Sequence, residues 1–243
     1  MRTLETERLI LNKWTTSEED VKGLFEFAKN PEVGPNAGWK PHADLAESRM
    51  IIEDIFLPYD VWSIREKATG RIVGNIGLEP DRRREDVASR ELGYSLAKDC
   101  WGKGYMTEAA RAVIDYAFED LGIVVLGVCT GPDNVRSQRV IEKCGFSYEG
   151  RQRRGYHIFD GTDRDNLVYS MLREEWEAAR PAPIGDADLS VSDSNCGWRR
   201  ASSCLGSTAR TASCSVIIPS STRSQAILMA AAAVLLPLRV WSM

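Results

Sequence analysis

The chain has 243 residues and a formal net charge of −4, which fits one domain of ordinary size plus an extension. This mildly acidic balance gives no reason to expect nucleic acid as a partner. Residues 1–11 carry two glutamates and no long apolar run, so we expect neither a signal peptide nor a membrane anchor. The six cysteines include no C-x-x-C pair, which favours a reduced, cytoplasmic setting and gives no reason to expect a metal.

The first part of the chain changes from helical to strand periodicity. The hydroxyl and acidic residues of 15–19 are typical of a helix start, and Pro31 ends the apolar pattern that follows. From residue 61 onward the period is two, interrupted by a turn at Thr69-Gly70. We predict a strand over 8–13, helices over 15–30 and 44–56, and strands over 61–67, 71–78 and 88–96.

The second part begins with the clearest amphipathic helix in the chain. Its apolar stripe spans 107–121 and stops at Gly122. Later, Gly145 ends a second helix and Asp160-Gly161 is a strong hairpin signal. We predict a strand over 124–130, a helix over 134–144, and strands from 146 and over 166–172. The order β-α-α-β-β-β-α-β-α-β-β predicts an α/β (α+β) fold, a mixed sheet with helices on both faces.

The composition breaks near residue 180. From Pro181 onward there is no lysine and no regular periodicity, and Ser, Ala and Arg dominate. The apolar run over 226–236 is well short of the roughly 20 residues that span a bilayer. We therefore expect a folded domain over 1–178 and a low-complexity tail over 179–243, disordered or non-native, without chemistry of its own.

The stretch Trp101-Gly102-Lys103-Gly104-Tyr105-Met106-Thr107 joins the strand that ends at residue 96 to the amphipathic helix. A glycine-rich turn before a helix presents unpaired backbone N–H groups, and glycine lets a phosphate approach the backbone closely. The G-x-x-x-x-G-K-[ST] phosphate loop is absent, and Thr107 stands where the dinucleotide fingerprint needs its third glycine. The sequence thus predicts a pyrophosphate site of another type.

This stretch resembles the acyl-CoA loop of the GNAT superfamily of N-acetyltransferases, Q/R-x-x-G-x-G/A, although Trp101 and Met106 depart from its outer positions. Glu91-Leu92-Gly93-Tyr94, Asn134-x-x-Ser137 and the later Glu142-Lys143-x-Gly145-Phe146 are similar to the branch of ribosomal-protein alanine N-acetyltransferases (RimJ/RimL-like). The resemblance covers residues 4–176. It implies a GNAT fold, with a mostly antiparallel central sheet whose strands splay to admit acyl-CoA.

The resemblance also implies the cofactor-binding residues, with acetyl-CoA as co-substrate. Backbone N–H groups of the loop would hold the pyrophosphate, helped by the helix dipole, and Lys103 would add a charge at the rim. Backbone groups near Tyr94 and Leu96 would polarise the thioester carbonyl. Asn134 would bond the pantetheine arm. The full predicted set is Tyr94, Leu96, Trp101, Gly102, Lys103, Gly104, Tyr105, Met106, Thr107, Asn134 and Ser137.

Three residues are candidates for catalysis. Glu91 would take a proton from the ammonium, unless it forms a structural ion pair. Ile141 stands where many GNAT members have a tyrosine acid, so Ser137 would protonate the leaving thiolate, alone or together with a role as helix cap. Spacing from Ser137 places Tyr156 where this branch carries a glutamate near the acceptor. His157, beside it, has the pKa range of a base, but we expect a surface role.

The expected reaction is acetyl transfer to a primary amine in a ternary complex, with a protein N-terminus as the acceptor that the resemblance implies. Two alternatives stay open: an acetyltransferase for a small amine, such as an antibiotic, polyamine or amino acid, and a non-catalytic acyl-CoA-binding module. We expect no nucleic-acid or membrane partner. A homodimer would be possible through a free sheet edge.

Overall fold

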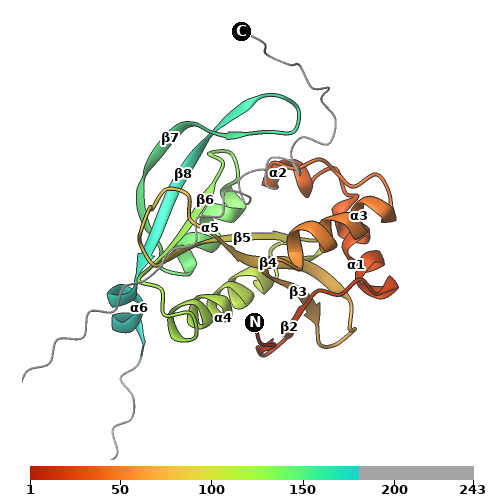
Figure 1. The fold of residues 1–243 in the computed structure, drawn as a ribbon, viewed down its shortest axis with the longest axis horizontal. Coiled ribbons are helices and arrows are strands. Elements are labelled where there is room, and N and C mark those ends of the chain that lie inside the picture. Colours follow the sequence, from red (N-terminus) through yellow and green to blue (C-terminus); the bar gives the residue numbers. More distant parts are fainter. Residues whose placement is uncertain (181–243) are drawn as a thin grey trace, which may run out of the picture. The chain divides into compact units, whose positions relative to one another are not determined.

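The computed structural model describes residues 1–180 (Figure 1). The predicted tail therefore lies almost entirely outside the described residues, and the domain boundary after residue 178 stays a proposal. The strands are β1 (Leu4–Glu5), β2 (Leu9–Lys13), β3 (Asp60–Glu66), β4 (Ile72–Glu79), β5 (Ser89–Leu96), β6 (Val125–Thr130), β7 (Ser147–His157) and β8 (Asp163–Leu172). The helices are α1 (Glu18–Ala28), α2 (Gly34–Ala37), α3 (Leu45–Ile51), α4 (Tyr105–Glu119), α5 (Val135–Lys143) and α6 (Arg173–Ala179).

The strands form one sheet in the order β1-β2-β3-β4-β5-β6-β8-β7. Neighbours are antiparallel except β5 and β6, which run parallel. The β5–β6 register starts at Ser89 opposite Val125 and ends at Leu92 opposite Val128. Beyond Leu92 the two strands diverge, so the backbone from Gly93 to Leu96 has no strand partner on its β6 side. The predicted splay is thus present, in the middle of a mostly antiparallel sheet.

Helices cover both faces of the sheet (Figure 1). On one face α1 packs closely, because a Cβ placed on Gly23 would come within 2.6 Å of the Ile72 side chain. On the other face α4 packs with the Tyr116 ring edge-on to the Trp62 indole, at 5.2 Å between ring centroids. The largest fully buried side chains bind these layers together: Trp14, Trp62, Phe118, Leu9, Leu11, Leu24, Ile52, Ile64, Ile76, Leu78, Leu126 and Ile141.

Most predicted elements are confirmed, with shifted ends. The α4 helix begins at Tyr105 rather than Thr107, because Gly104 (φ 82°) is already its N-terminal cap. The predicted 44–56 helix divides into α3 and a π-helical turn over Ile52–Phe56. The strand β8 begins at Asp163, before the predicted start at residue 166, because it pairs with β7 as far as the tip of the hairpin. The strand β7 is largely exposed. The short β1 and α2, and α6, were not predicted.

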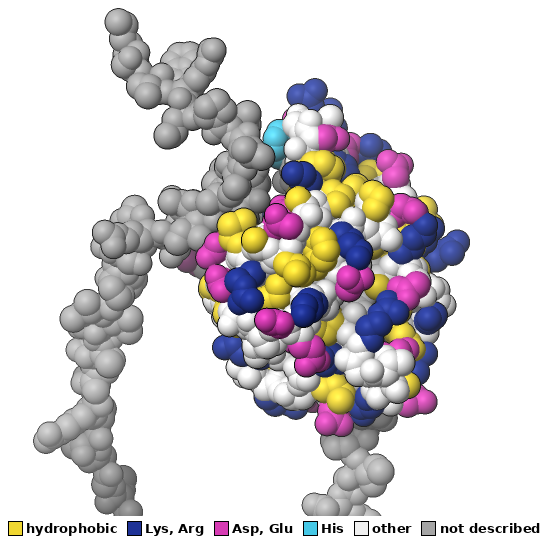
Figure 2. Space-filling model, turned by 90° about the vertical axis from the view of Figure 1, so that its right-hand side faces the viewer, with side chains coloured by type: hydrophobic (Ala, Val, Ile, Leu, Met, Phe, Trp, Pro, Cys, Tyr) yellow, Lys and Arg dark blue, Asp and Glu magenta, His cyan; other side chains and the backbone are white. Residues whose placement is uncertain are grey.

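The surface agrees with the modest net charge. On the face that Figure 2 shows, Lys and Arg side chains alternate with Asp and Glu, and neither sign dominates. Among the residues that the structure describes, no helix has the length and apolar character needed to cross a membrane.

Candidate active site

The glycine loop ends in an unpaired helix N-terminus. Gly102 (φ 77°) and Gly104 (φ 82°) both adopt the left-handed conformation that only glycine takes without strain. Glu108 N–H donates the first bond of α4, to the Gly104 carbonyl at 3.1 Å. The N–H groups of residues 105–107 therefore have no acceptor within the helix. These donors and the helix dipole together favour an anion at this end of α4.

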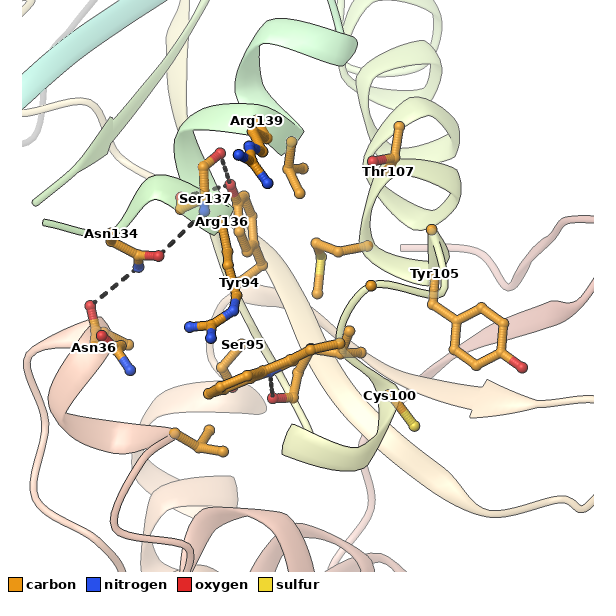
Figure 3. Close-up of a pocket in the computed structure, with 18 of the residues that line it drawn as sticks. Asn36, Tyr94, Ser95, Cys100, Tyr105, Thr107, Asn134, Arg136, Ser137 and Arg139 are labelled. Atoms are coloured by element: carbon orange, nitrogen blue, oxygen red, sulfur yellow. Dashed lines mark hydrogen bonds between the residues drawn. The ribbon is translucent and has the colours of Figure 1, made fainter.

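A cavity of about 400 Å³ opens beside this loop, where β5 leaves β6 (Figure 3). Its walls come from the loop, from β5 around Tyr94 to Leu96, from α5, and from α2, which is distant in sequence. We name it the β5–β6 cavity. It is lined by Val33, Asn36, Ala37, Tyr94, Ser95, Leu96, Cys100, Trp101, Gly102, Gly104, Tyr105, Met106, Thr107, Asn134, Arg136, Ser137, Arg139, Val140 and Lys143.

The helix α5 brings cations to this cavity that the sequence analysis missed. Arg136, Arg139 and Lys143 all line it, and the Arg136 guanidinium carbon lies 4.5 Å from the centroid of the Trp101 ring. Their spacing of three and four residues places them on one helix face, a signal that the sequence already contained. Together with the free N–H groups of α4, they make the cavity suitable for a polyanion such as a phosphate chain.

Hydroxyl groups meet at the start of α5. The Ser137 and Tyr94 hydroxyls share a hydrogen bond of 2.8 Å, and burial raises the pKa of the Tyr94 phenol well above its ordinary value. The phenol therefore stays protonated at neutral pH. The helix cap is Asn134, whose side-chain oxygen accepts from Ser137 N–H at 3.1 Å. The predicted capping role of Ser137 is thus wrong, since its hydroxyl faces Tyr94 instead.

The short helix α2 is fastened across the end of the cavity. Its Asn36 carbonyl accepts from Asn134 Nδ2 at 3.4 Å and from an Arg164 guanidinium nitrogen at 3.2 Å (Figure 3). The Tyr156 ring lies against Gly38, where any Cβ would come within 2.3 Å of it. Arg164 also stacks on that ring at 5.2 Å. Three separate segments of the chain, around α2, α5 and the β7–β8 hairpin, therefore close this end together.

Glu91 forms an ion pair, which the sequence analysis gave as the alternative to a role as the base. A carboxylate oxygen lies 2.8 Å from Arg83 Nη2, and the same oxygen accepts from the Cys129 thiol at 3.0 Å. Burial, followed by the Glu91 charge, raises the pKa of Cys129 to about 12, so the thiol stays protonated. The role of Glu91 as a base stays a prediction.

A second carboxylate, Glu79, was not among the predicted site residues. Glu79 and Glu91 are direct antiparallel partners on β4 and β5. Protein surrounds the Glu79 carboxylate closely although it remains open to solvent, and this partial desolvation, followed by the Glu91 charge, raises its pKa. We use the name carboxylate recess for the group of Glu79, Glu91 and Tyr156, which act on one another electrostatically. Burial likewise raises the pKa of Tyr156, with a further contribution from Glu79.

Several other predicted residues have different surroundings. The Tyr105 side chain points away from the β5–β6 cavity and donates to Glu66 at 2.5 Å, so only its backbone faces the cavity (Figure 3). Lys103 belongs to the loop but does not line the cavity. The exposed His157 pairs with Asp163 at 2.9 Å, which agrees with the surface role expected for it. Within residues 1–180, no three His, Cys, Asp or Glu side chains gather closely enough to hold a metal ion.

Comparison with known proteins gives a consistent result. Residues 8–147 match the family model of the acetyltransferase (GNAT) domain. The chain is 31% identical over 181 residues to the uncharacterized N-acetyltransferase p20 of Bacillus licheniformis, covering 72% of this chain and 99% of p20. It is 40% identical over 90 residues to YdaF of Bacillus subtilis, a candidate ribosomal N-acetyltransferase, covering 37% of this chain and 49% of YdaF.

A solved structure of a GNAT-family acetyltransferase has a similar fold. A GNAT-family acetyltransferase from Bacillus anthracis superposes with a TM-score of 0.64 at 21% identity, covering 72% of this chain and all of the other. The family model and the p20 similarity together span the glycine loop, the diverging strands and the helix α5. The resemblance inferred from the loop and the Asn-x-x-Ser motif is confirmed, and the chain belongs to the GNAT family of acetyltransferases.

Proposed function

We propose that this GNAT acetyltransferase transfers the acetyl group of acetyl-CoA directly to a protein N-terminal α-amine in a ternary complex. The observation that carries the proposal is the β5–β6 cavity, which is lined by the glycine loop, by α5 and by the part of β5 that no longer pairs with β6. Cations and free N–H groups lie on the Tyr94 side of β5, and the alternation of side chains along the strand places Glu91, with its partner Glu79, on the opposite side. An anionic cofactor and a cationic amine would thus approach the gap from opposite sides.

The cofactor side uses three kinds of contact. The N–H groups of 105–107 and the α4 dipole would hold the pyrophosphate, with Arg136 and Arg139 as counter-charges and Lys103 at the rim. The unpaired β5 backbone near Tyr94 and Leu96 would bond the pantetheine and the thioester oxygen. The Trp101 indole already donates to the Leu96 carbonyl at 2.8 Å, which fixes the loop against β5.

Catalysis would depend mainly on positioning, because two bound reactants replace a bimolecular encounter. A carboxylate of the recess would accept a proton from the ammonium, and the neutral nitrogen would attack the thioester carbon. As the carbon–sulfur bond breaks, the Ser137 hydroxyl would protonate the thiolate. Its bond to the buried, protonated Tyr94 phenol supplies a short path for replacing that proton. Tyr156 would contact the acceptor at the far end.

The choice of acceptor class has a separate basis from that of the cofactor. It rests on the local similarity to YdaF, whose name refers to ribosomal N-acetylation and of whose length this chain matches about half. Glu79 and Tyr156 are both exposed, the latter on the largely exposed strand β7, so the end of a polypeptide could reach them. A small amine remains the alternative acceptor.

The test is release of free CoA thiol from acetyl-CoA by the full chain, with N-terminal peptides and with small amines as separate panels. We expect turnover with peptides and little with polyamines, amino acids or aminoglycosides. Turnover confined to small amines would overturn the acceptor assignment. Tight acetyl-CoA binding without any turnover, measured by calorimetry, would identify a cofactor-binding module and remove the catalytic roles.

A further inference from the structure

We propose that Glu79 is the general base of this site and that Glu91, fixed by Arg83, is its positioning partner. This inference rests on the proposed function, because it names the group that takes the proton from the acceptor amine. It departs from the sequence analysis, in which Glu91 held that role and Glu79 had none.

The first argument is the position of Glu79 at the divergence of the strands. Its Oε1 lies 3.8 Å from the point that a Cβ on Gly93 would occupy. Gly93 is the first β5 residue beyond the last β5–β6 pair, at Leu92 and Val128. Since Gly93 has no side chain, the Glu79 carboxylate lies over bare backbone where the gap between β5 and β6 begins. An amine that enters the gap from this face would meet Glu79.

The second argument is the difference between the two carboxylates. One Glu91 oxygen already has two partners, the Arg83 guanidinium at 2.8 Å and the Cys129 thiol at 3.0 Å. These two contacts hold that oxygen in place, so it is not available to an entering amine. Among the described residues, Glu79 forms no hydrogen bond or ion pair with another side chain, and it is open to solvent. A group that must reach a mobile substrate needs this freedom.

The third argument is electrostatic. The charged and titratable groups that act on Glu79 are Glu91 on β5, Arg82 in the following loop and Tyr156 on β7. Desolvation and the negative Glu91 raise the pKa of Glu79, and Arg82 opposes them. A raised pKa brings a carboxylate closer to the pH at which it exchanges protons efficiently. Glu91 thus tunes Glu79, while the contact with Arg83 holds Glu91 in place.

The proton balance is as follows. The acceptor ammonium gives one proton to the Glu79 carboxylate, which returns it to solvent. The neutral nitrogen forms the carbon–nitrogen bond with the acetyl carbon, and the carbon–sulfur bond breaks. The thiolate takes a proton from Ser137, and the second amine proton passes through water and the Tyr94 hydroxyl to restore the Ser137 hydroxyl. The net products are the acetamide, free CoA thiol and one proton.

The experiment compares Glu79→Gln, Glu91→Gln and the control Glu85→Gln in the full chain. Glu85 is an exposed carboxylate of the same loop region. With the best N-terminal peptide at neutral pH, we expect Glu79→Gln to lower kcat/KM about 100-fold, the lower range for general bases. The loss should shrink to a few-fold near pH 9.5, well above the α-amine pKa of about 8, where the amine is already neutral. The control should match the unmodified chain.

Glu91→Gln separates the tuning role from the base role. Removing the negative neighbour lowers the pKa of Glu79, so the acidic limb of the kcat/KM profile should move to lower pH while its plateau changes little. We expect acetyl-CoA affinity to be unchanged in every variant, and this control would show that each variant folds. A 100-fold loss in Glu91→Gln with a normal Glu79→Gln would overturn the assignment. If the unmodified chain binds acetyl-CoA but acetylates no amine, the proposed function falls and this inference with it.

Discussion

The β5–β6 cavity and the carboxylate recess lie on opposite sides of one strand and have opposite electrostatic character. Cations of α5 and free N–H groups of α4 line the cavity, whereas Glu79 and Glu91 line the recess. The pleat of β5 makes this possible, because alternate residues face opposite sides. Tyr94 contacts α5, while Glu91 and Gly93 face the recess. One strand can thus bring an anionic donor and a cationic acceptor to a single gap.

The two regions also differ in how they are built. The cavity depends on a contiguous loop with a special backbone conformation. The recess depends on side chains from β4, β5 and β7 that meet only in the folded sheet. Changes to the loop backbone should therefore weaken acetyl-CoA binding at the cavity without altering the recess. Side-chain changes should show, by their separate effects on acetyl-CoA binding and on the reaction rate, which of the two regions each residue serves.

The largest expected effect on binding comes from the loop backbone. The double change Gly102→Ala with Gly104→Ala forces two left-handed positions on residues that disfavour them, at about 1–2 kcal/mol each. We expect acetyl-CoA affinity to fall about 100-fold in calorimetry. Gly70→Ala is the matched control, since Gly70 (φ 71°) lies in the distant β3–β4 turn, and it should leave affinity unchanged. Equal losses in both variants would contradict the anion-site role of the loop.

The next largest effect is expected from the hydroxyl pair of Ser137 and Tyr94. Ser137→Ala and Tyr94→Phe each remove one partner of the 2.8 Å bond. We expect either to lower kcat about 30-fold, somewhat below the usual range for an acid because water still reaches the thiolate. Acetyl-CoA affinity should stay within a few-fold. If the two groups act as one path, the double variant is little worse than either single one, and fully multiplicative losses would refute that coupling.

The cations of α5 should have a smaller, salt-dependent effect. Arg136→Gln with Arg139→Gln removes two charges from the cavity wall, and we expect roughly tenfold weaker acetyl-CoA binding at low salt. The difference should narrow as salt is added, because screening already weakens these pairs. Arg153→Gln on the exposed β7 is the control. A loss of acetyl-CoA affinity that stays constant between about 50 mM and 1 M salt would show that the two arginines act through packing rather than through charge.

The smallest effect tests the helix cap. Asn134→Ala and Ser17→Ala each remove a side chain that caps a helix, α5 and α1 respectively. Each should lower the free energy of unfolding by about 1 kcal/mol, which corresponds to a Tm about 3 °C lower. Only Asn134→Ala should also weaken acetyl-CoA binding, since Asn134 lines the cavity. If both variants bind equally well, Asn134 has no cofactor role.

Much of the cavity could be predicted from the sequence, because its parts are local. The glycine pair, the following amphipathic helix and the Asn-x-x-Ser motif are each contiguous, and their spacing already indicates an anion site at a helix start. Even Arg136, Arg139 and Lys143 were accessible through helical spacing. The exact start of α4 could not be predicted, because the apolar periodicity does not reach its first turn. Only the structure shows that Gly104 is the N-terminal cap.

The recess could not be predicted, for a physical reason. Glu79 and Glu91 become neighbours only through the β4–β5 register, and Tyr156 comes near them only because the β7–β8 hairpin closes on Gly38, which caps α2. The sequence by itself determined most of the element order and, through its motifs, the family, and it predicted the cofactor loop, since these depend on local periodicity and contiguous residues. Only the tertiary structure decided that Glu91 is paired with Arg83 and that Glu79 has no side-chain partner within residues 1–180, because residues far apart in the chain set those environments.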